Sequence, residues 1–281
     1  MVNIACLLTG SWPHPTPALR QKVPDLSERY VEHLYAGVSR FMPPNIPWRF
    51  TCFTDREPQH MPGIPTHKLP RGYNGWFNKL YLFSPDAYPA GARVLYFDLD
   101  TAITGNLARL ATASLDVPIL LRDVWASAHA ASGVMSFRAG PALHPIWAEF
   151  RDRGLHPPPY TAVAARLKAG TAYQEGKGRM IRTDEQWLHQ YLYPNNWVGW
   201  QDLLGETALV SYKKNILGMN SGKGWRAPRG WKPADTDTSV VYFHGVPRPH
   251  DVVVPWQSNW RGVHARPEGT AVAAHRIEEI W

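Results

Sequence analysis

The amino-acid sequence predicts an α/β protein whose central sheet is mainly parallel and is covered by helices on both faces. Three observations predict this class. Short apolar segments alternate with amphipathic ones over the first half of the chain. Several of the short segments are apolar throughout, as strands buried on both faces of a sheet are. Aspartates follow two of these segments, and in such sheets ligands bind beyond the carboxyl ends of the strands.

The expected elements begin with a strand, a helix and a second strand. NIACLLTG (3–10) and WRFTCFTD (48–55) are rich in apolar residues and are followed by turn residues, which favours strands. Between them, LSERYVEHLYAGVSRFM (26–42) has the apolar spacing of an amphipathic helix. NGWFNKLYLF (74–83) predicts the start of a further helix.

The later part of the chain is less regular. The segment 211–233 is rich in Gly and Pro and predicts a loop. No internal repeat or clear linker divides the chain, so we expect one domain. The remaining expected elements are strands at 92–100, 117–123, 131–140 and 239–245, and helices at 141–154, 160–170 and 184–193.

Composition narrows the class of protein. The 281 residues are 44% hydrophobic and 19% charged, which indicates a folded protein. The two cysteines, Cys6 and Cys52, lie in apolar runs and are expected to be reduced core thiols. We see neither a signal peptide nor an apolar run of the roughly 18 residues that span a membrane, and we expect a soluble, cytoplasmic protein. The formal charge of +7 favours anionic partners: nucleotides, nucleic acid or a membrane surface.

The segment VLYFDLDTAITGNL (94–107) carries the clearest chemical signal. Side chains alternate along a strand, so Asp98 and Asp100 are expected on one side and Leu99 in the core. Paired carboxylates suit Mg²⁺ or Mn²⁺, and these ions keep open positions for phosphate oxygens. The pattern predicts a metal and diphosphate site. The alternative is two solvated aspartates that cap a turn, because Asp-x-Asp is a short pattern.

The surrounding segment 77–110 resembles nucleotide-sugar glycosyltransferases of the GT-A fold, most closely the family of glycogenin and the bacterial lipopolysaccharide galactosyltransferases. Lys79 and Leu80 resemble the family's Lys-Leu pair before the strand, and Asn106 and Leu107 its Asn-Leu turn. The resemblance implies that Asp98 contacts the ribose or the metal. It also implies that Asp100 is a metal ligand.

Two later segments match the same family in order. AASGVMSFRAG (130–140) resembles the family's Asn-(Ser/Ala)-Gly-Val strand, but Ala131 replaces the Asn and leaves Ser132 as a weaker contact to the donor sugar. TDEQWLHQYL (183–192) resembles the family's Asp-Gln helix start beneath the anomeric carbon. Gln186 matches the Gln, and either Asp184 or Glu185 takes the acidic place.

The segment YFHGVPRPHD (242–251) resembles a shortened form of the family's closing motif. The resemblance implies that His244 is the third metal ligand and that Arg248 replaces a phosphate-binding Lys. The alternative for His244 is a core histidine at a strand end. Lys79 is a candidate donor-binding residue that would assist at the diphosphate, and its alternative is a solvated lysine at a helix terminus.

The ends of the first two strands are candidates for nucleoside binding, as they are in the GT-A fold. Thr9, Gly10 and Asp55 are the candidate base and ribose contacts. Asp55 could accept a hydrogen bond from the uracil N3–H, or it could be an ordinary turn aspartate.

Two other classes of function remain open. LYFDLDTAIT resembles the first motif of haloacid-dehalogenase-type phosphatases, in which the first Asp is a nucleophile, but the threonine comes one position early and two strand–helix units precede it. Nucleic-acid binding is the other class, because residues 213–232 combine cations with tryptophans. Those residues are Lys213, Lys214, Lys223, Trp225, Arg226, Arg229, Trp231 and Lys232.

The expected function is a metal-dependent glycosyltransferase with a nucleoside-diphosphate sugar donor, a UDP-hexose, and Mn²⁺ or Mg²⁺. The resemblance implies retention, although inversion with Asp184 or Glu185 as general base stays open. Residues 1–250 would form the domain, with donor binding in about 1–140 and acceptor and lid in about 141–250, and 251–281 would be a tail. The acceptor could be a glycan, a lipid-linked glycan, a protein or a modified base in DNA. The expected acceptor or lid residues are Lys223, Trp225, Arg226 and Trp231.

Overall fold

The protein is an α/β structure built on one large sheet and one small one. The computed structural model describes residues 1–9, 26–55, 57, 61–70, 75–123, 129–152, 183–192, 196–216, 219–220, 224–225, 238–244 and 248–249. The strands of the large sheet are β1 (Val2–Leu8), β2 (Trp48–Thr54), β3 (Thr66–Lys68), β4 (Arg93–Phe97), β6 (Ile119–Arg122), β7 (Ala130–Arg138) and β8 (Val198–Gly199).

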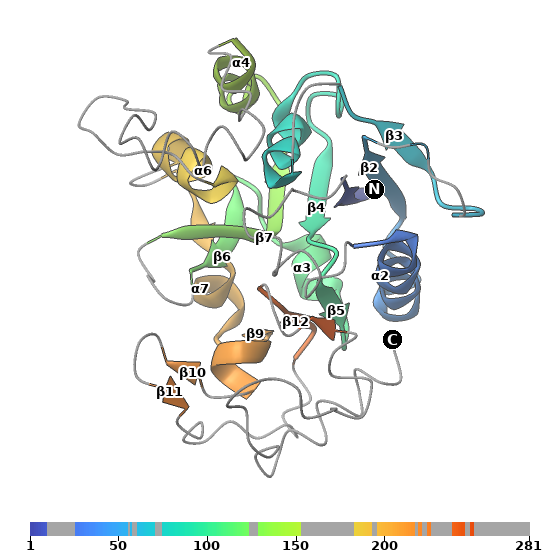
Figure 1. The fold of residues 1–281 in the computed structure, drawn as a ribbon, viewed down its shortest axis with the longest axis vertical. Coiled ribbons are helices and arrows are strands. Elements are labelled where there is room, and N and C mark those ends of the chain that lie inside the picture. The colour runs from blue at the N-terminus through green and yellow to red at the C-terminus, as the bar shows by residue number, and fades with distance from the viewer. Residues whose placement is uncertain are drawn as a thin grey trace, which may run out of the picture.

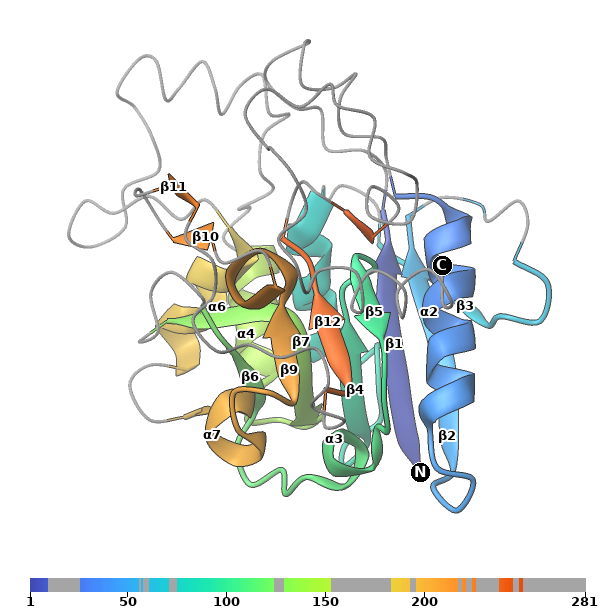
Figure 2. The same ribbon diagram turned by 90° about the horizontal axis from the view of Figure 1, so that it is seen from below.

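The seven strands of the large sheet lie in the order β3-β2-β1-β4-β7-β6-β8. Parallel pairing joins β3 to β2, β2 to β1, β1 to β4 and β6 to β8. Only β7 runs against its neighbours β4 and β6. The expected mainly parallel sheet is therefore confirmed, and the carboxyl ends of β1, β2 and β4 share one edge (Figure 2).

A three-stranded sheet lies against one face of the large one. Its strands are β5 (Thr101–Ile103), β12 (Val240–Tyr242) and β9 (Leu209–Ser211), in that order. The strand β12 is antiparallel to β5 and parallel to β9. This sheet brings the end of the described chain next to the turn that follows β4.

Helices cover both faces of the large sheet (Figure 1). One face packs against α2 (Glu28–Phe41), α3 (Ala108–Thr112), α7 (Trp200–Leu204) and the small sheet. The other packs against the 3₁₀-helix η1 (Gly75–Phe83), α4 (His144–Asp152) and α6 (Asp184–Leu192). The sheet is therefore the middle of three layers.

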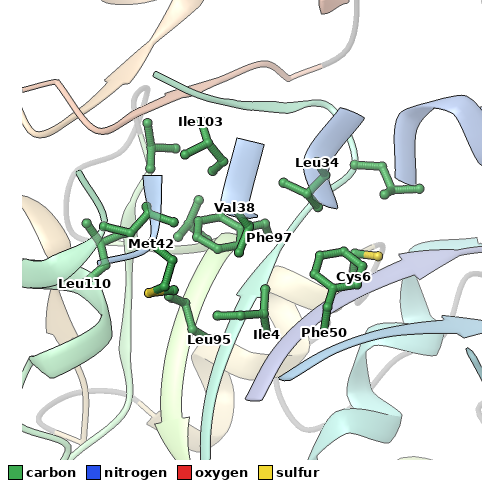
Figure 3. Close-up of a cluster of buried hydrophobic side chains, with 14 of the residues drawn as sticks. Ile4, Cys6, Leu34, Val38, Met42, Phe50, Leu95, Phe97, Ile103 and Leu110 are labelled. Carbon is green, nitrogen blue, oxygen red and sulfur yellow. The ribbon is translucent and has the colours of Figure 1, made fainter. Parts of the chain in front are cut away.

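The core on the α2 side follows directly from the periodicity of the sequence. Leu34 and Val38 are one helical turn apart on α2, and both contact the cluster that contains Ile4 and Cys6 of β1 (Figure 3). The alternate residues of β1, such as Leu7, belong to the core on the opposite face. This is why β1 is apolar throughout, as the sequence predicted.

Several expected elements are confirmed and some need correction. The expected strand 92–100 ends at Phe97, because Leu99 and Asp100 turn toward β5. The expected loop 211–233 is wrong in part: it contains a π-helical turn, η2 (Tyr212–Ile216), and the paired strands β10 (Met219–Asn220) and β11 (Gly224–Trp225). Helix 160–170 and the tail 251–281 lie outside the described residues.

Two further observations concern the cysteines and the described helices. Cys6 and Cys52 are free and buried, as the sequence predicted. Among the helices that the structure describes, none combines the length and the apolar character needed to cross a membrane.

Candidate functional site

The turn after β4 holds the Asp-x-Asp residues at the carboxyl edge of the sheet. The Asp98 backbone N–H donates to the Gly133 carbonyl oxygen at 2.8 Å, so the neighbouring strand β7 positions the start of the turn. Leu99 is 2% exposed and packs in the core, which confirms its expected direction. The backbone turn, and not a continued strand, presents Asp98 and Asp100.

The Asp98 carboxylate is held by two buried neighbours. Tyr96, two residues earlier on β4, donates its hydroxyl to Asp98 Oδ1 at 2.6 Å. The Lys79 ammonium lies 2.9 Å from the same oxygen. Tyr96 was not among the expected site residues, although its position on the same side of the strand as Asp98 could have indicated it.

Lys79 joins the turn to the beginning of α6. Its Nζ donates to Ser132 Oγ at 2.9 Å and lies 3.3 Å from Asp184 Oδ2. The Ser132 hydroxyl in turn donates to Asp184 Oδ2 at 2.6 Å. Three distant segments of the chain, η1, β7 and α6, therefore meet at one buried network, which we call the Lys79 network (Lys79, Asp98, Ser132 and Asp184).

Burial sets the electrostatics of this network. Lys79 is only 4% exposed, so the alternative of a solvated lysine is wrong. Burial alone would lower the pKa of Lys79, but the carboxylates of Asp184 and Asp98 more than offset this and raise its pKa. Lys79 is therefore a fixed positive charge between two carboxylates.

The two acidic residues at the start of α6, Asp184 and Glu185, make different contacts. Asp184 is 3% exposed and faces the Lys79 network. Glu185 Oε1 instead accepts a hydrogen bond of 3.3 Å from the Ser132 backbone N–H. Burial, with the nearby Asp184 carboxylate, raises the pKa of Glu185 to about 7. Gln186 is exposed in the same helical turn.

Asp100 pairs with a residue from the far end of the described chain. Arg248 Nη1 lies 3.2 Å from Asp100 Oδ2. The Phe243 backbone N–H donates to the Asp100 carbonyl oxygen at 3.0 Å, so the end of β12 is anchored to this turn. Burial raises the pKa of Asp100 to about 7; Arg248 opposes this shift and Asp98 adds to it.

His244 lies close by but faces another partner. Its Nε2 lies 2.7 Å from Ser211 Oγ on β9, and its backbone carbonyl oxygen accepts a hydrogen bond from the Lys213 ammonium. Burial, and then the positive charge of Lys213, lowers the pKa of His244 to about 4. A neutral imidazole can bind a metal, but this one is engaged by Ser211.

The fit of a divalent ion is therefore partial. Asp98 and Asp100 are two carboxylates in one turn, which is the donor chemistry that Mn²⁺ and Mg²⁺ prefer. Among the described residues, no three His, Cys, Asp or Glu side chains gather closely enough to hold a metal ion. The two aspartates fit the ion, whereas the Nε2 atom of His244 is engaged by Ser211, which leaves Nδ1 as its candidate metal-binding atom.

The structure describes only some of the other expected site residues. Thr9 directly follows β1 and is half-buried, and Asp55 directly follows β2 and is exposed. Because β1 lies between β2 and β4, both residues share the edge of Asp98 and Asp100. Trp225 is in β11, but its side chain lies outside the description. The expected residues that lie outside the described ones are Gly10, Lys223, Arg226, Arg229, Trp231 and Lys232.

Several solved structures of glycosyltransferases have a similar fold. GlyE of Streptococcus pneumoniae TIGR4 is similar with a TM-score of 0.50 and 12% identity, over 99% of this chain and 61% of GlyE. The galactosyltransferase LgtC, in complex with donor and acceptor sugar analogues, has a TM-score of 0.52 and 14% identity, over 99% of this chain and 94% of LgtC. The bifunctional WbbM has a TM-score of 0.51 and 10% identity, over 88% of this chain and 46% of WbbM.

By sequence, no family model and no curated protein matches the chain. The structural likenesses, at 10 to 14% identity, establish a shared fold. The chain spans about 61% of the length of GlyE and 94% of that of LgtC. The fold is thus shared with these glycosyltransferases, and the chemistry must be argued from the residues of the site.

Proposed function

We propose that the protein is a glycosyltransferase that moves a hexose from a nucleoside-diphosphate sugar, a UDP-sugar, to an acceptor hydroxyl. The observation that carries this proposal is the Lys79 network. It joins the Asp-x-Asp turn to the first turn of α6 at the carboxyl edge of the sheet. Ligands of open α/β sheets bind at this edge. LgtC, which shares the fold, binds donor and acceptor sugar analogues.

A divalent ion, Mn²⁺ or Mg²⁺, belongs to the proposal. Asp98 and Asp100 would hold it, with His244 as a third ligand. The ion would supply positive charge to the donor diphosphate. Arg248, now paired with Asp100, is the residue best placed to add a second positive charge beside that diphosphate.

The contacts of Asp184 support retention of anomeric configuration over inversion through that residue. Its Oδ2 accepts a hydrogen bond from Ser132 and lies beside the Lys79 ammonium. Both contacts occupy the oxygen that a general base would need to take the proton of the acceptor hydroxyl. Glu185, with a pKa raised to about 7, is the better candidate if the reaction inverts. Gln186, exposed beside it, would face the transferred sugar.

The phosphatase alternative fits the site less well. Its nucleophile would be Asp98, but one oxygen of that carboxylate already accepts the Tyr96 hydroxyl and lies beside Lys79. Incubation with p-nitrophenyl phosphate should leave Asp98 unmodified in peptide mass spectrometry. An aspartyl phosphate at this position would favour the phosphatase. A modified base in DNA stays an open choice of acceptor.

A donor screen tests the proposal. We expect one UDP-sugar to release UDP in the presence of Mn²⁺, faster with glycan or DNA acceptors, and EDTA to abolish the release. Asp100→Asn should lose both Mn²⁺ binding, measured by electron paramagnetic resonance, and UDP release. Asp116→Asn, at an exposed loop position, is the matched control and should retain both. Full turnover in EDTA would exclude the ion, and no release from any nucleotide sugar would contradict the transferase.

A further inference from the structure

A cavity of about 700 Å³ borders the amino ends of β1, β2 and β4, and its lining continues along β2 to Phe53 and along β3 to His67. Its lining includes Asn3 near the start of β1, Arg49 near the start of β2 and Arg93, the first residue of β4. In contrast, Thr9 and Asp98 follow the carboxyl ends of β1 and β4. The cavity is therefore separate from the Lys79 network.

Arginines are prominent on the cavity lining. Arg49 and Arg138, both exposed, and the half-buried Arg93 belong to it, and no Asp or Glu among the described residues does. Arg93 donates to the Ala113 carbonyl oxygen at 2.6 Å, and Arg138 to the Gly91 carbonyl oxygen at 3.1 Å. These hydrogen bonds orient two of the guanidinium groups without neutralising them.

Two of these arginines are direct neighbours across the sheet. Arg93 of β4 pairs with Arg138 of β7 in the strand register. Like charges at such positions are destabilising. Burial, and then the charge of Arg138, lowers the pKa of Arg93. A bound anion would remove this repulsion.

Two polar side chains join the arginines on the lining. Thr51 of β2 brings a half-buried hydroxyl group, and His67 of β3 brings an imidazole that lies 3.2 Å from the Tyr81 hydroxyl group. Tyr88 also belongs to the lining, and its ring packs edge-on against Phe53 at 5.6 Å. The hydroxyl oxygen of Tyr88 is closed off from solvent, so a ligand in the cavity would not contact it.

We propose that this cavity is a second binding site, for a phosphorylated sugar. Arginine side chains bind phosphate in a bidentate manner, and the hydroxyl and imidazole groups suit the hydroxyl groups of a sugar. The volume lies within the range of about 300–1,000 Å³ that is usual for small-molecule sites. A ligand with both phosphate and hydroxyl groups uses both sets of side chains. The proposal does not depend on the function of the carboxyl edge.

Thermal shift and ligand-observed NMR with glucose 1-phosphate test this site. Glucose 1-phosphate should bind the wild-type protein more tightly than inorganic phosphate or glucose does. The double variant Arg49→Gln/Arg138→Gln should weaken binding at least about tenfold, because both charges are lost. Arg109→Gln, an exposed arginine of α3 outside the lining, should leave binding unchanged.

Thr51→Val supplies a test that does not depend on a loss of folding. It replaces the half-buried hydroxyl group of the lining by a methyl group of similar shape, and valine suits a strand, so the variant should melt near the wild-type temperature without ligand. Its affinity for glucose 1-phosphate should nevertheless fall about threefold to tenfold. Binding that survives in the double arginine variant, or inorganic phosphate that binds as tightly as glucose 1-phosphate, would overturn the proposal.

Discussion

Ser132 is the residue whose role depends most on the folded structure. Its hydroxyl group accepts a hydrogen bond from Lys79 and donates one to Asp184, at 2.9 and 2.6 Å. We predict that Ser132→Ala lowers the free energy of unfolding by about 1–3 kcal/mol, because two buried charged groups each lose a partner. Turnover should fall as well, because Ser132 would no longer position Asp184 directly or Asp98 through Lys79. Urea unfolding and UDP release measure the two effects.

Ser136 offers a matched control on the same strand. It is also fully buried, and its hydroxyl group donates to the Val94 carbonyl oxygen at 2.9 Å, away from the Lys79 network. Ser136→Ala should therefore cost a similar amount of stability and leave UDP release per folded molecule unchanged. If both variants lose turnover in proportion to stability, Ser132 has no positioning role.

Glu185 predicts a pH dependence of stability. Burial raises its pKa in the folded protein to about 7, from an ordinary value of 4.5. Between these two values the folded protein holds a proton that the unfolded chain has released, so this group lowers stability as the pH rises through that window. The charged groups that face it are Asp184, Lys79 and Asp98.

Glu185→Gln should remove this contribution. The amide oxygen can still accept from the Ser132 backbone N–H, and no charge is buried. We predict that the variant is about 1–3 kcal/mol more stable than wild type at pH 7 and that its free energy of unfolding falls less between pH 4.5 and 7. Glu32→Gln, at an exposed position of α2, should keep the wild-type slope. If the free energy of unfolding of Glu185→Gln has the wild-type dependence on pH, the raised pKa of Glu185 is contradicted.

At the scale of elements, long local patterns were predictable and short strands were not. The apolar run of β1 and the periodicity of α2 are local, and both were located within two residues. The strands β5 and β9 have only three residues each and are held by pairing with β12, far away in the chain. No local pattern specifies such a partner, so these two strands were missed, although the third strand of the small sheet, β12, was predicted at 239–245.

The same distinction applies to the candidate site. Asp98 and Asp100 follow a strong strand signal, so their place at the sheet edge was predictable. That Ser132 joins Lys79 to Asp184 depends on residues 53 and 52 positions apart in the chain. The direction of His244 depends on Ser211, 33 residues away. These contacts arise from tertiary packing and not from sequence spacing.

Gly105 allows the start of β12 to lie close to the turn that follows β5. A Cβ atom at this position would lie 2.6 Å from the Thr238 carbonyl oxygen, and the Gly105 N–H donates to the Ser239 carbonyl oxygen at 3.2 Å. Gly105→Ala should push β12 away and lower the free energy of unfolding by about 1–3 kcal/mol. Gly140→Ala, which has open space around it, should change the stability little. Equal urea midpoints for both variants would show that the contact yields easily.

At the scale of the whole molecule, one sheet separates two proposed sites. The Lys79 network lies at the carboxyl end of β4, and the arginine-lined cavity lies at the amino ends of the same group of strands. The two sites share no side chain, although Phe53 of the cavity lining lies two residues before Asp55, a candidate donor contact. Sites without shared side chains are expected to act independently.

If the two sites act independently, their two ligands should raise the stability of the folded protein additively. Each ligand that binds only the folded protein raises its stability by mass action. UDP with Mn²⁺ should raise the melting temperature through the carboxyl edge, and glucose 1-phosphate should raise it further by the same free energy when UDP is saturating. Asp100→Asn should lose only the first effect, and Arg49→Gln/Arg138→Gln only the second. If saturating UDP with Mn²⁺ abolishes the effect of glucose 1-phosphate, both ligands compete for one site and the second site does not exist.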